Sequence, residues 1–309
     1  MADSISIVMP AKNEAVGLNE LLPKLKSAYP DAEIIVVNDG STDNTAEVVH
    51  AHGATLISHP YSIGNGAAIK SGARHANGDI LIFMDGDGQH DAADIPRLLE
   101  QIEAGYEMAV GARAWDTHAS LGRKIANRVY NQLASYMTGH KIDDLTSGFR
   151  AVRGRHFRRF LYLFPNGFSY PSTCTMAFFR SGLPVSYVPI RTLSRAGSSH
   201  IRILKDGVRF FMVIIKIGTL FSPMRLFLPI SAALFVTGLS YYGYTYSTQH
   251  RFTNMSALLL ISSVLTFLIG ILAELISSLH YKEADFERRL VSREITEPET
   301  TSSGSKITQ

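Results

Sequence analysis

Two aspartates separated by one glycine follow an apolar run in the sequence DILIFMDGDGQH. Asp85 and Asp87 stand just past a predicted buried strand at Ile80–Phe83, where two carboxylates can share one hard divalent cation. Gln89 supplies a neutral oxygen two residues further on. Such a cation can neutralise a diphosphate, the leaving group of a nucleotide sugar. We therefore predict a Mg²⁺ or Mn²⁺ site at Asp85, Asp87 and Gln89.

A calcium-binding EF-hand is the competing interpretation of the same segment. It requires glycine at the sixth position and glutamate at the twelfth, where this chain has His90 and Pro96. A predicted strand, and not a helix, also precedes the loop. The EF-hand is therefore excluded.

Polar residues also follow two other apolar runs. VMPAKNEA carries Glu14, which could cap the next helix or touch a nucleotide. VVNDGSTDNTAEV carries Asp39, whose carboxylate can accept hydrogen bonds from a base or ribose, and Ser41, which offers a hydroxyl in a turn. Asp43 or Asn44 can cap the following helix, and this is compatible with binding by Asp39.

Three further segments carry arginines that could meet phosphate. Arg113 lies in GAR, and DLTSGFRA brings Ser147 and Arg150 beside the same expected cleft. Arg195 lies on the Gly/Ser-rich LSRAGSSH, which could close over a donor. An ordinary surface charge is the alternative for each arginine. The segment IGNGAAIKSG matches neither GK[ST] nor GxGxxG, so Gly64–Gly66 predicts a turn with close backbone approach to a ligand possible.

The elements that must position these residues alternate between strands and helices in the first part of the chain. Alternation of this kind predicts an α/β fold with parallel strands covered by helices on both faces, and a ligand beyond the carboxyl ends of the strands. The predicted strands are Ile5–Met9, Ile34–Val37, Ile80–Phe83 and Met108–Val110. The predicted helices are Glu14–Ala28, Thr45–His52, Gly66–His75 and Ile95–Ala104.

Two long apolar stretches dominate the last third. Leu226–Tyr246 and Ala257–Leu279 are each long enough to cross a bilayer, which takes about 20 helical residues, and buried core helices are the alternative. Basic residues flank the outer ends, so both the N-terminal domain and the tail are predicted to face the cytoplasm. Glu274 lies inside the second stretch near its cytoplasmic end, where it could serve function or reach the headgroups.

Charge is uneven although the net charge is only +3. From residue 150 to 209 there are eleven Arg or Lys residues and one acid, Asp206. This block predicts an anionic partner, and membrane lipid is favoured over nucleic acid because no nucleic-acid motif accompanies it. Ile201–Ile217 is a basic amphipathic helix typical of the headgroup layer, and Leu121–Met137 is either a second such helix or one packed on the sheet.

Four regions follow from these patterns. They are a catalytic domain at 1–200, an interfacial helix at 201–225, two membrane spans at 226–280 and a disordered cytoplasmic tail at 281–309. The single cysteine, Cys174, allows no intramolecular disulfide, which suits a reducing compartment. The N-terminus is predicted to be a strand and not a signal peptide. A homo-oligomer is left open.

Seven motifs together resemble family 2 glycosyltransferases with the GT-A fold, and within them the polyprenyl-phosphate glycosyltransferases, which include dolichol-phosphate mannose synthase. PAKNE, NDGSTD, GNGAAIKSG, DGDGQH, GAR, TSGFR and R-x-G-S occur in the order and at the separations of that family. The resemblance spans nearly the whole chain, and the two apolar stretches fit its bacterial branch. It implies metal-dependent, inverting transfer of one hexose-type sugar from a UDP- or GDP-linked donor to undecaprenyl or dolichyl phosphate in a membrane, here the bacterial inner membrane.

The resemblance also implies roles for single residues. Asp85, Asp87 and Gln89 would hold the metal and diphosphate. The nucleotide would be lined by Pro10, Ala11, Glu14, Asp39, Ser41 and Asp85. Phosphates of donor or acceptor would be contacted by Arg113, Arg123 and Arg195, and the lipid phosphate or membrane by Arg123, Ser147, Arg150, Arg202 and Lys205. Asn65 and Ser199–His200 replace lysines that are frequent in the family, and Arg202 or Lys205 could substitute for the second.

Two other functions compete with this one. A processive polysaccharide synthase usually carries a Q-x-x-R-W signature, and the neighbours of Trp115, the single tryptophan, do not fit it. A non-catalytic membrane receptor for nucleotide sugars is the second, and the intact aspartate pair argues against it.

Overall fold

The structure is a computed structural model that describes residues 3–113, 121–167, 169–190, 215, 218–219 and 222–296. Side chains of 121–127 and 280–296 lie outside this description. The chain divides into two compact units, Met1–Phe221 and Ser222–Gln309.

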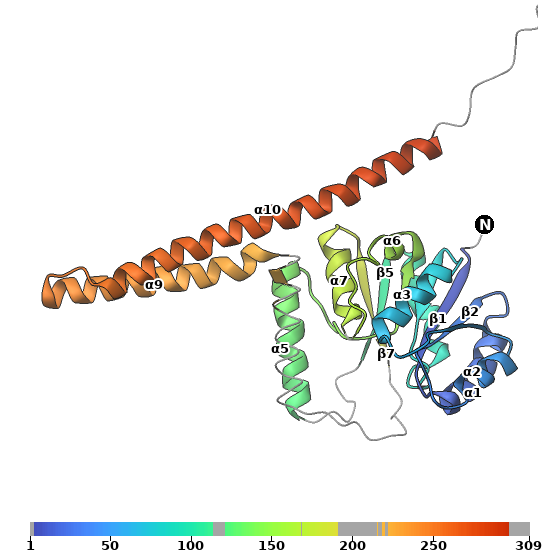
Figure 1. Cartoon of the computed structure of the whole chain (residues 1–309). Helices are drawn as coiled ribbons and strands as arrows, with labels where there is room; N and C mark the ends of the chain where they lie inside the picture. The colour runs from blue at the N-terminus through green and yellow to red at the C-terminus, as the bar shows by residue number, and fades with distance from the viewer. Residues whose placement is uncertain are drawn as a thin grey trace, which may run out of the picture. The chain divides into compact units, whose positions relative to one another are not determined.

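A seven-stranded sheet forms the centre of the first unit, in the order β3-β2-β1-β4-β6-β5-β7 (Figure 1). All neighbouring strands are parallel except β6, which runs antiparallel to both β4 and β5. The parallel strands agree with the alternation in the sequence, and the mixed, mostly parallel sheet agrees with the GT-A fold implied by the resemblance. The strands are β1 Ile5–Ala11, β2 Glu33–Asn38, β3 Thr55–Ser58, β4 Ile80–Phe83, β5 Met108–Arg113, β6 Arg150–Arg153 and β7 Val185–Ile190.

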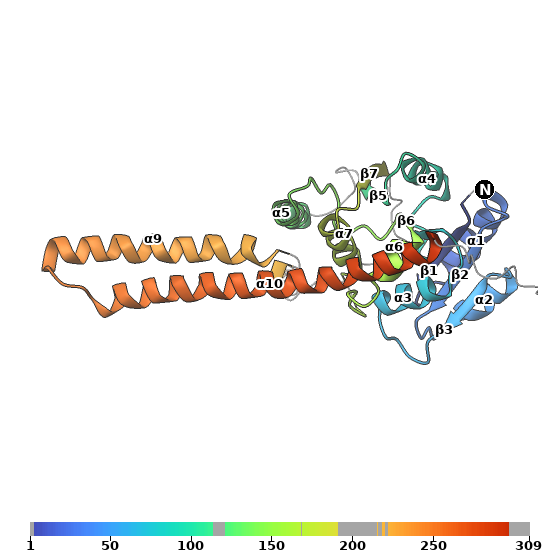
Figure 2. The same ribbon diagram turned by 90° about the horizontal axis from the view of Figure 1, so that it is seen from above.

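Helices cover both faces of this sheet (Figure 2). On one face, side chains of α1, α2 and α4 pack with those of β1, β2 and β4 in one apolar core. The other face is covered by α3, α6 and α7; Phe83 of β4, for example, contacts Phe157 of α6 with ring centroids 4.4 Å apart. The helices are α1 Ala15–Ala28, α2 Thr45–Ala51, α3 Asn65–His75, η1 Ala92–Asp94, α4 Ile95–Glu103, α5 Leu121–Thr138, α6 Gly154–Arg159 and α7 Tyr170–Arg180.

The register of the strands brings the predicted motifs to one edge of the sheet. Ala11 at the end of β1 is paired with Asn38 at the end of β2, and Val8 of β1 is paired with Phe83 at the end of β4. Because β6 is antiparallel, its first residue, Arg150, is also paired with Phe83. The site therefore receives residues that follow β1, β2 and β4 and residues that precede β6.

Helix α5 is oriented differently from the apolar stripe predicted for Leu121–Met137. Its buried positions are Tyr130, Ala134 and Met137, and the Tyr130 hydroxyl donates to Ser172 Oγ of α7 at 3.0 Å. Val129, a member of the predicted stripe, is 55% exposed. The helix therefore packs on the domain through residues outside the predicted stripe, of which Leu121 and Ile125 lie outside the described side chains.

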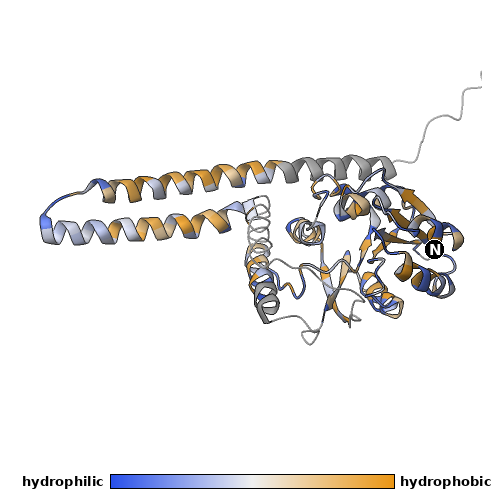
Figure 3. Ribbon diagram, turned by 60° about the horizontal axis from the view of Figure 1, so that its bottom comes forward, coloured by the Kyte–Doolittle hydropathy of each residue, from blue (hydrophilic) through white to orange (hydrophobic). Residues whose placement is uncertain are grey.

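The second unit is a hairpin of two long helices, α9 Pro223–Gln249 and α10 Asn254–Thr296 (Figure 3). Both are long and apolar enough to cross a membrane, and only 11% and 17% of their most apolar windows are buried. Core helices of a soluble protein are mostly buried, so this low burial argues against that alternative. The disordered tail predicted from residue 281 is wrong as far as Thr296, because helix-forming Glu, Arg, Leu and Ala continue α10 until the approach to Pro298.

Small residues line the contact between the two helices at intervals of seven. In α9 they are Ser231, Gly238 and Thr245, and in α10 they are Ser256, Ser263, Gly270 and Ser277, all buried. A seven-residue period keeps one narrow face of each helix against its neighbour. Two reciprocal hydrogen bonds cross this face, from Ser231 Oγ to Ser263 O at 2.9 Å and from Ser263 Oγ to Ser231 O at 3.0 Å.

A large side chain in this row of small residues, the seam between α9 and α10, is expected to separate the two helices. A Cβ on Gly270 would lie 2.8 Å from Phe227 Cβ, so Gly270→Leu is over-packed and should cost about 1–3 kcal/mol in the free energy of unfolding of the hairpin. Gly243→Leu is the matched control, because a Cβ there meets nothing within 4 Å. Thermal unfolding of the full chain in detergent measures both. Equal melting temperatures for the two variants would contradict the seam.

Glu274 has a partner inside the hairpin. Its Oε2 accepts a hydrogen bond from Met224 N at 3.3 Å, in the first turn of α9, where the N-cap residue Ser222 makes no side-chain capping bond. The first N–H groups of a helix have no partners within the helix. A carboxylate at this position also suits the positive end of the helix dipole. The acid in the second span thus caps the first span.

Candidate active site

A cavity of about 390 Å³ opens at the edge of the sheet where β1, β2 and β4 end. It brings together five residues predicted to bind nucleotide, namely Pro10, Ala11, Glu14, Asp39 and Asp85, and the predicted metal ligand Asp87. The remaining lining residues are Lys12, Ser62, Gly64, Asn65, Ala68 and Gly86. Motifs that lie up to about 75 residues apart in the chain therefore meet in one place.

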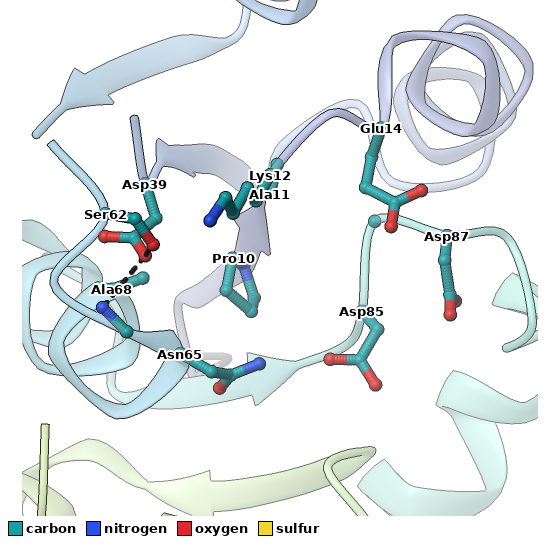
Figure 4. A pocket seen from close by; sticks show the side chains of 12 residues that line it. Pro10, Ala11, Lys12, Glu14, Asp39, Ser62, Asn65, Ala68, Asp85 and Asp87 are labelled. Atoms are coloured by element: carbon teal, nitrogen blue, oxygen red, sulfur yellow. Dashed lines mark hydrogen bonds between the residues drawn. The ribbon is translucent and has the colours of Figure 1, made fainter. Parts of the chain in front are cut away.

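Three of the four acidic side chains that line the cavity lie on one side of it. Figure 4 shows Glu14, Asp85 and Asp87 on that side and Asp39 with Ser62 on the opposite side. Within the described ranges, no three His, Cys, Asp or Glu side chains are arranged to hold a metal by themselves. Two hard carboxylates that share one wall suit a Mg²⁺ or Mn²⁺ ion whose other ligands are waters and phosphate oxygens. The residues present therefore fit a cation that binds together with a diphosphate.

Gln89 contributes a backbone contact to this wall. Its N–H donates to Asp87 Oδ1 at 3.1 Å and so orients the carboxylate, while Gln89 is not among the residues that line the cavity. Its role as a metal ligand stays a prediction. Ser41 also lies outside the lining. Its Oγ accepts from Asn13 N at 3.0 Å and its N–H donates to Asn38 Oδ1, so it links the loops after β1 and β2.

Asp39 organises the opposite wall. Its carboxylate is 4% exposed and accepts four hydrogen bonds, from His59 Nδ1 at 2.7 Å, Ser62 Oγ at 2.8 Å, and the N–H groups of Ile63 and Gly64 at 2.9 Å. Ser71 Oγ holds the other ring nitrogen of His59 at 2.9 Å. Burial alone would raise the pKa of Asp39, but the four hydrogen bonds outweigh it and lower the pKa.

The lowered pKa of Asp39 predicts a dependence of stability on pH. A carboxylate with a depressed folded pKa stabilises the fold above its unfolded pKa, near 3.9, and this contribution disappears as the pH falls through the folded pKa. Asp39→Asn should cost about 2–3 kcal/mol in the free energy of unfolding at pH 7, because the amide cannot accept all four bonds. Thermal unfolding at pH 7 and pH 3 should show the difference from wild type shrinking at pH 3. A difference that stays constant would contradict this account.

The glycine-rich segment packs closely against the backbone of residues 164–167. A Cβ on Gly66 would lie 2.1 Å from Pro165 O, and Ala67 N donates to Asn166 O at 2.8 Å. Lys70 Nζ adds a bond to Phe164 O at 3.1 Å. The predicted contact of Gly64–Gly66 with a ligand is thus corrected in part: Gly64 lines the cavity, while Gly66 is needed where α3 docks on residues 164–167.

Arg113 is held by Asp144 beside the cavity. Its Nε and Nη2 donate to the two carboxylate oxygens at 2.7 and 3.0 Å, and Nη2 also donates to Thr146 Oγ1. The Arg113 side chain remains 37% exposed, whereas that of Asp144 is 10% exposed. Burial would raise the pKa of Asp144, but the hydrogen bonds and charge of Arg113 lower it. Contact of Arg113 with phosphate stays a prediction, and it would have to use the exposed part of the guanidinium.

The predicted contact of Arg150 with lipid phosphate is wrong. Arg150 is 0% exposed, and its guanidinium donates to the carbonyls of Ser147 and Pro171 beneath α7. Ser147 is only 2% exposed, so it does not present a hydroxyl to a lipid either. TSGFR begins β6 inside the sheet, and its polar residues are turned into the domain.

Other arginines of the basic block are also engaged by protein groups. Arg153 pairs with Asp3, Arg155 pairs with Glu107 at 3.1 Å, and Arg158 donates to three carbonyls at the end of α3. The excess of positive charge in the described part of this block therefore serves the fold to a large extent. Among the predicted phosphate ligands, Arg195, Arg202 and Lys205 lie outside the described residues, and so does the side chain of Arg123.

Sequence reasoning missed several residues of the site. Lys12 lies within PAKNE and Asn65 within GNGAAIKSG, so their motifs marked them, although neither was assigned a role. Ser62 and Ala68 carry no signal apart from their proximity to these motifs. His90 is stacked on Phe149 with ring centroids 4.9 Å apart, and its Nε2 lies 3.6 Å from Asp85 Oδ2.

Comparison with known families identifies the class of protein. Residues 6–176 match glycosyl transferase family 2, and residues 222–279 match the GtrB C-terminal hairpin. The chain belongs to glycosyl transferase family 2 and is a glycosyltransferase. The resemblance seen in the sequence motifs is thereby confirmed, and so is the predicted hairpin.

Similar curated proteins come from archaea and bacteria. The chain is 26% identical over 297 residues to glycosyltransferase AglJ of Haloferax volcanii, covering 91% of this chain and 96% of that one. It is 33% identical over 170 residues to the undecaprenyl-phosphate 4-deoxy-4-formamido-L-arabinose transferase of Edwardsiella ictaluri. That match covers 51% of each protein, so the chain spans about half the length of this relative.

Solved structures confirm the fold. Glucosyl-3-phosphoglycerate synthase from Mycobacterium tuberculosis, in complex with Mn²⁺, UDP-glucose and phosphoglyceric acid, superposes with a TM-score of 0.56. The sequence identity is 20%, and the match covers 70% of this chain and 79% of that one. At this identity the likeness concerns the fold alone, and it agrees with the predicted GT-A architecture.

Proposed function

We propose that the protein transfers one hexose-type sugar from a nucleotide-sugar donor, UDP- or GDP-linked, to polyprenyl phosphate at a membrane surface. The observation that carries the proposal is one chain holding both an acid-walled cavity at the carboxyl edge of the sheet and a hairpin of membrane-spanning length. The Edwardsiella relative is an undecaprenyl-phosphate 4-deoxy-4-formamido-L-arabinose transferase, and this similarity supports the same acceptor class.

In this proposal the two walls of the cavity hold the two ends of the donor. The Asp39 wall and the Pro10–Lys12 segment would line the nucleotide, and Asp85 and Asp87 would face its diphosphate. A divalent cation on these carboxylates would neutralise the leaving diphosphate. Arg113, whose guanidinium Asp144 holds in place, would orient a phosphate through its exposed edge.

The acceptor phosphate needs little activation by the protein. A phosphate monoester has its second pKa near 6 and is already an anion at neutral pH. The task of the protein is then to bring two anions together and to align the attacking oxygen with the anomeric carbon. A single direct displacement forms the bond from phosphate oxygen to sugar, breaks the bond to the diphosphate and inverts the anomeric centre.

The hairpin would place the active site at the surface where the lipid headgroup lies. The ring of Tyr242 contacts those of Tyr246 and Phe252 near the turn between α9 and α10, as expected for a helix end at a membrane–water interface. Basic residues flank the opposite ends of the hairpin, so the catalytic unit would face the cytoplasm, in bacteria at the inner membrane.

A donor screen tests the proposal. The full chain in detergent is incubated with Mn²⁺ or Mg²⁺, polyprenyl phosphate and a panel of UDP- and GDP-sugars, and glycolipid mass and released nucleotide are read in parallel. One donor should yield a polyprenyl-phosphate sugar, and EDTA should abolish the product. Product without lipid phosphate, or repeated sugar addition as in a polysaccharide synthase, would refute the acceptor. Binding of a nucleotide sugar without turnover would favour a receptor.

A further inference from the structure

A buried arginine without an acidic partner lies next to the proposed metal-binding wall. Arg150 is 0% exposed, and no Asp or Glu in the described part of the chain forms an ion pair with it. Its Nη1 donates to Pro171 O at 3.1 Å and Thr175 Oγ1 at 3.4 Å, and Nη2 donates to Ser147 O, while Nε has no hydrogen-bond partner among the described residues. Its guanidinium also lies 5.8 Å from the centre of the Tyr170 ring.

Such an arrangement does not favour stability. A buried charge loses its hydration, and apolar residues of similar volume often stabilise a fold as well or better. Arg150 donates to two backbone carbonyls, one hydroxyl and the Met108 sulfur, and these bonds offset part of that cost. The arginine at this position is therefore better explained by the function of the groups that its guanidinium contacts than by stability.

The groups held by Arg150 lead directly to Asp85. Ser147, whose carbonyl Arg150 binds, is followed by Gly148, and a Cβ on Gly148 would lie 3.4 Å from Asp85 Oδ2. Tyr170, whose ring faces Arg150, donates its hydroxyl to Gly148 O at 3.3 Å. Two contacts of the same guanidinium thus converge on the backbone that borders the carboxylate.

The next residue supports the other side of the same carboxylate. Phe149 is 0% exposed and stacks on His90, whose Nε2 lies 3.6 Å from Asp85 Oδ2. Arg150 is itself paired with Phe83, two residues before Asp85, in the antiparallel β4–β6 ladder. Residues 147–150 therefore form the backbone segment next to Asp85. Arg150 holds this segment through its bond to Ser147 O and through its own pairing with Phe83.

We infer that Arg150 is a positioning residue that holds Asp85 in the geometry required to bind a divalent cation with a nucleoside diphosphate. The guanidinium is a planar fork that can bind several carbonyls at fixed angles, which neither lysine nor an apolar side chain can do. Residues that hold the direct ligands of a metal in the right orientation affect its binding, and their loss typically weakens metal affinity about 10- to 100-fold. The inference rests on the proposed function and adds a residue that touches neither cation nor donor.

Binding of Mn²⁺ tests this inference without turnover. Free Mn²⁺ is counted by electron paramagnetic resonance while the full chain in detergent is titrated with Mn²⁺ in the presence of UDP or of GDP. Arg150→Met should weaken binding of Mn²⁺ about 10- to 100-fold. Arg158→Met is the matched control, since Arg158 also binds three backbone carbonyls but at the end of α3, and its Mn²⁺ affinity should stay within twofold of wild type.

A milder variant keeps the test decisive if Arg150→Met does not fold. Tyr170→Phe retains the ring and removes only the hydrogen bond to Gly148 O, and it should weaken Mn²⁺ binding several-fold with little change in melting temperature. A folded Arg150→Met, or failing that Tyr170→Phe, with wild-type Mn²⁺ affinity would overturn the positioning role. A wild-type chain that binds no Mn²⁺ with either nucleotide would instead refute the proposed function, and the two failures are seen in different samples.

Discussion

Asp87→Ala is expected to reduce sugar transfer at least about 1,000-fold, the largest effect of any single substitution in the cavity. Asp87 lines the acidic wall, and Gln89 N–H holds its carboxylate in place. Without it, the diphosphate would leave with its charge only partly neutralised, so the loss should fall on kcat more than on the donor KM. Rates of glycolipid formation at saturating Mn²⁺ measure the effect.

The control for Asp87→Ala lies four residues further along the same acidic segment. Asp91 is exposed, and its Oδ1 accepts from Ala93 N at 3.0 Å, which caps the short helix η1. Asp91→Ala should cost about 1 kcal/mol of stability at most and leave transfer within about twofold. If both variants lose activity equally, general damage to the segment explains the result, and if Asp87→Ala retains activity, the metal wall is misassigned.

Arg113→Met is expected to have the second largest effect, because it damages both stability and transfer. In this variant the carboxylate of Asp144 would keep the hydrogen bonds from Thr146 but lose its ion pair with the guanidinium. Because the Asp144 side chain is only 10% exposed, water would replace little of that interaction. Breaking a fully buried pair costs about 3–5 kcal/mol, and the partial exposure of Arg113 reduces our expectation to about 2 kcal/mol. Transfer should fall about 100-fold if the exposed edge of Arg113 meets a phosphate.

A double variant separates the two effects of Arg113→Met. Adding Asp144→Asn removes the stranded charge, so melting temperature should recover in part while transfer stays low. Lowering the pH should also recover part of the stability that the Arg113→Met single variant loses. Burial then dominates and raises the pKa of Asp144 in the single variant, so the stability gap to wild type should narrow as the pH falls from 7 towards 4. Recovery of transfer in the double variant would show that Arg113 acts only on the fold.

Local sequence patterns were sufficient to predict four of the seven strands, β1, β2, β4 and β5, and the edge of the sheet where the site lies. The apolar runs at Ile34–Val37 and Ile80–Phe83 are short, β-branched and bounded by polar turns, so they specify strands by themselves. Carboxyl ends of parallel strands share an edge, which places Asp39 and Asp85 at one cavity without further information. The hairpin followed from length and hydropathy alone.

The rest depended on contacts that no local pattern contains. Arg150 looks like a surface charge in a basic block, and only the antiparallel insertion of β6 between β4 and β5 turns it inward. The burial of Tyr130 and Met137 in α5 did not follow from the four-residue spacing that includes Val129, which is 55% exposed. The hydrogen bonds from His59 and Ser62 to Asp39 join residues about 20 apart in the sequence. The sequence alone therefore predicted that the Asp39 carboxylate binds a nucleotide, and not that it also organises the loop around it.

The seven-residue spacing of small residues in the hairpin restricts how its two helices can change length. Each residue of an α-helix turns the chain by about 100°, so one residue inserted between Ser263 and Gly270 would swing Gly270 and Ser277 away from α9. Seven inserted residues make two nearly complete turns and would bring the same face back, about 10 Å further along. Related chains that vary in span length should therefore differ by whole multiples of this repeat, or carry compensating insertions in both helices.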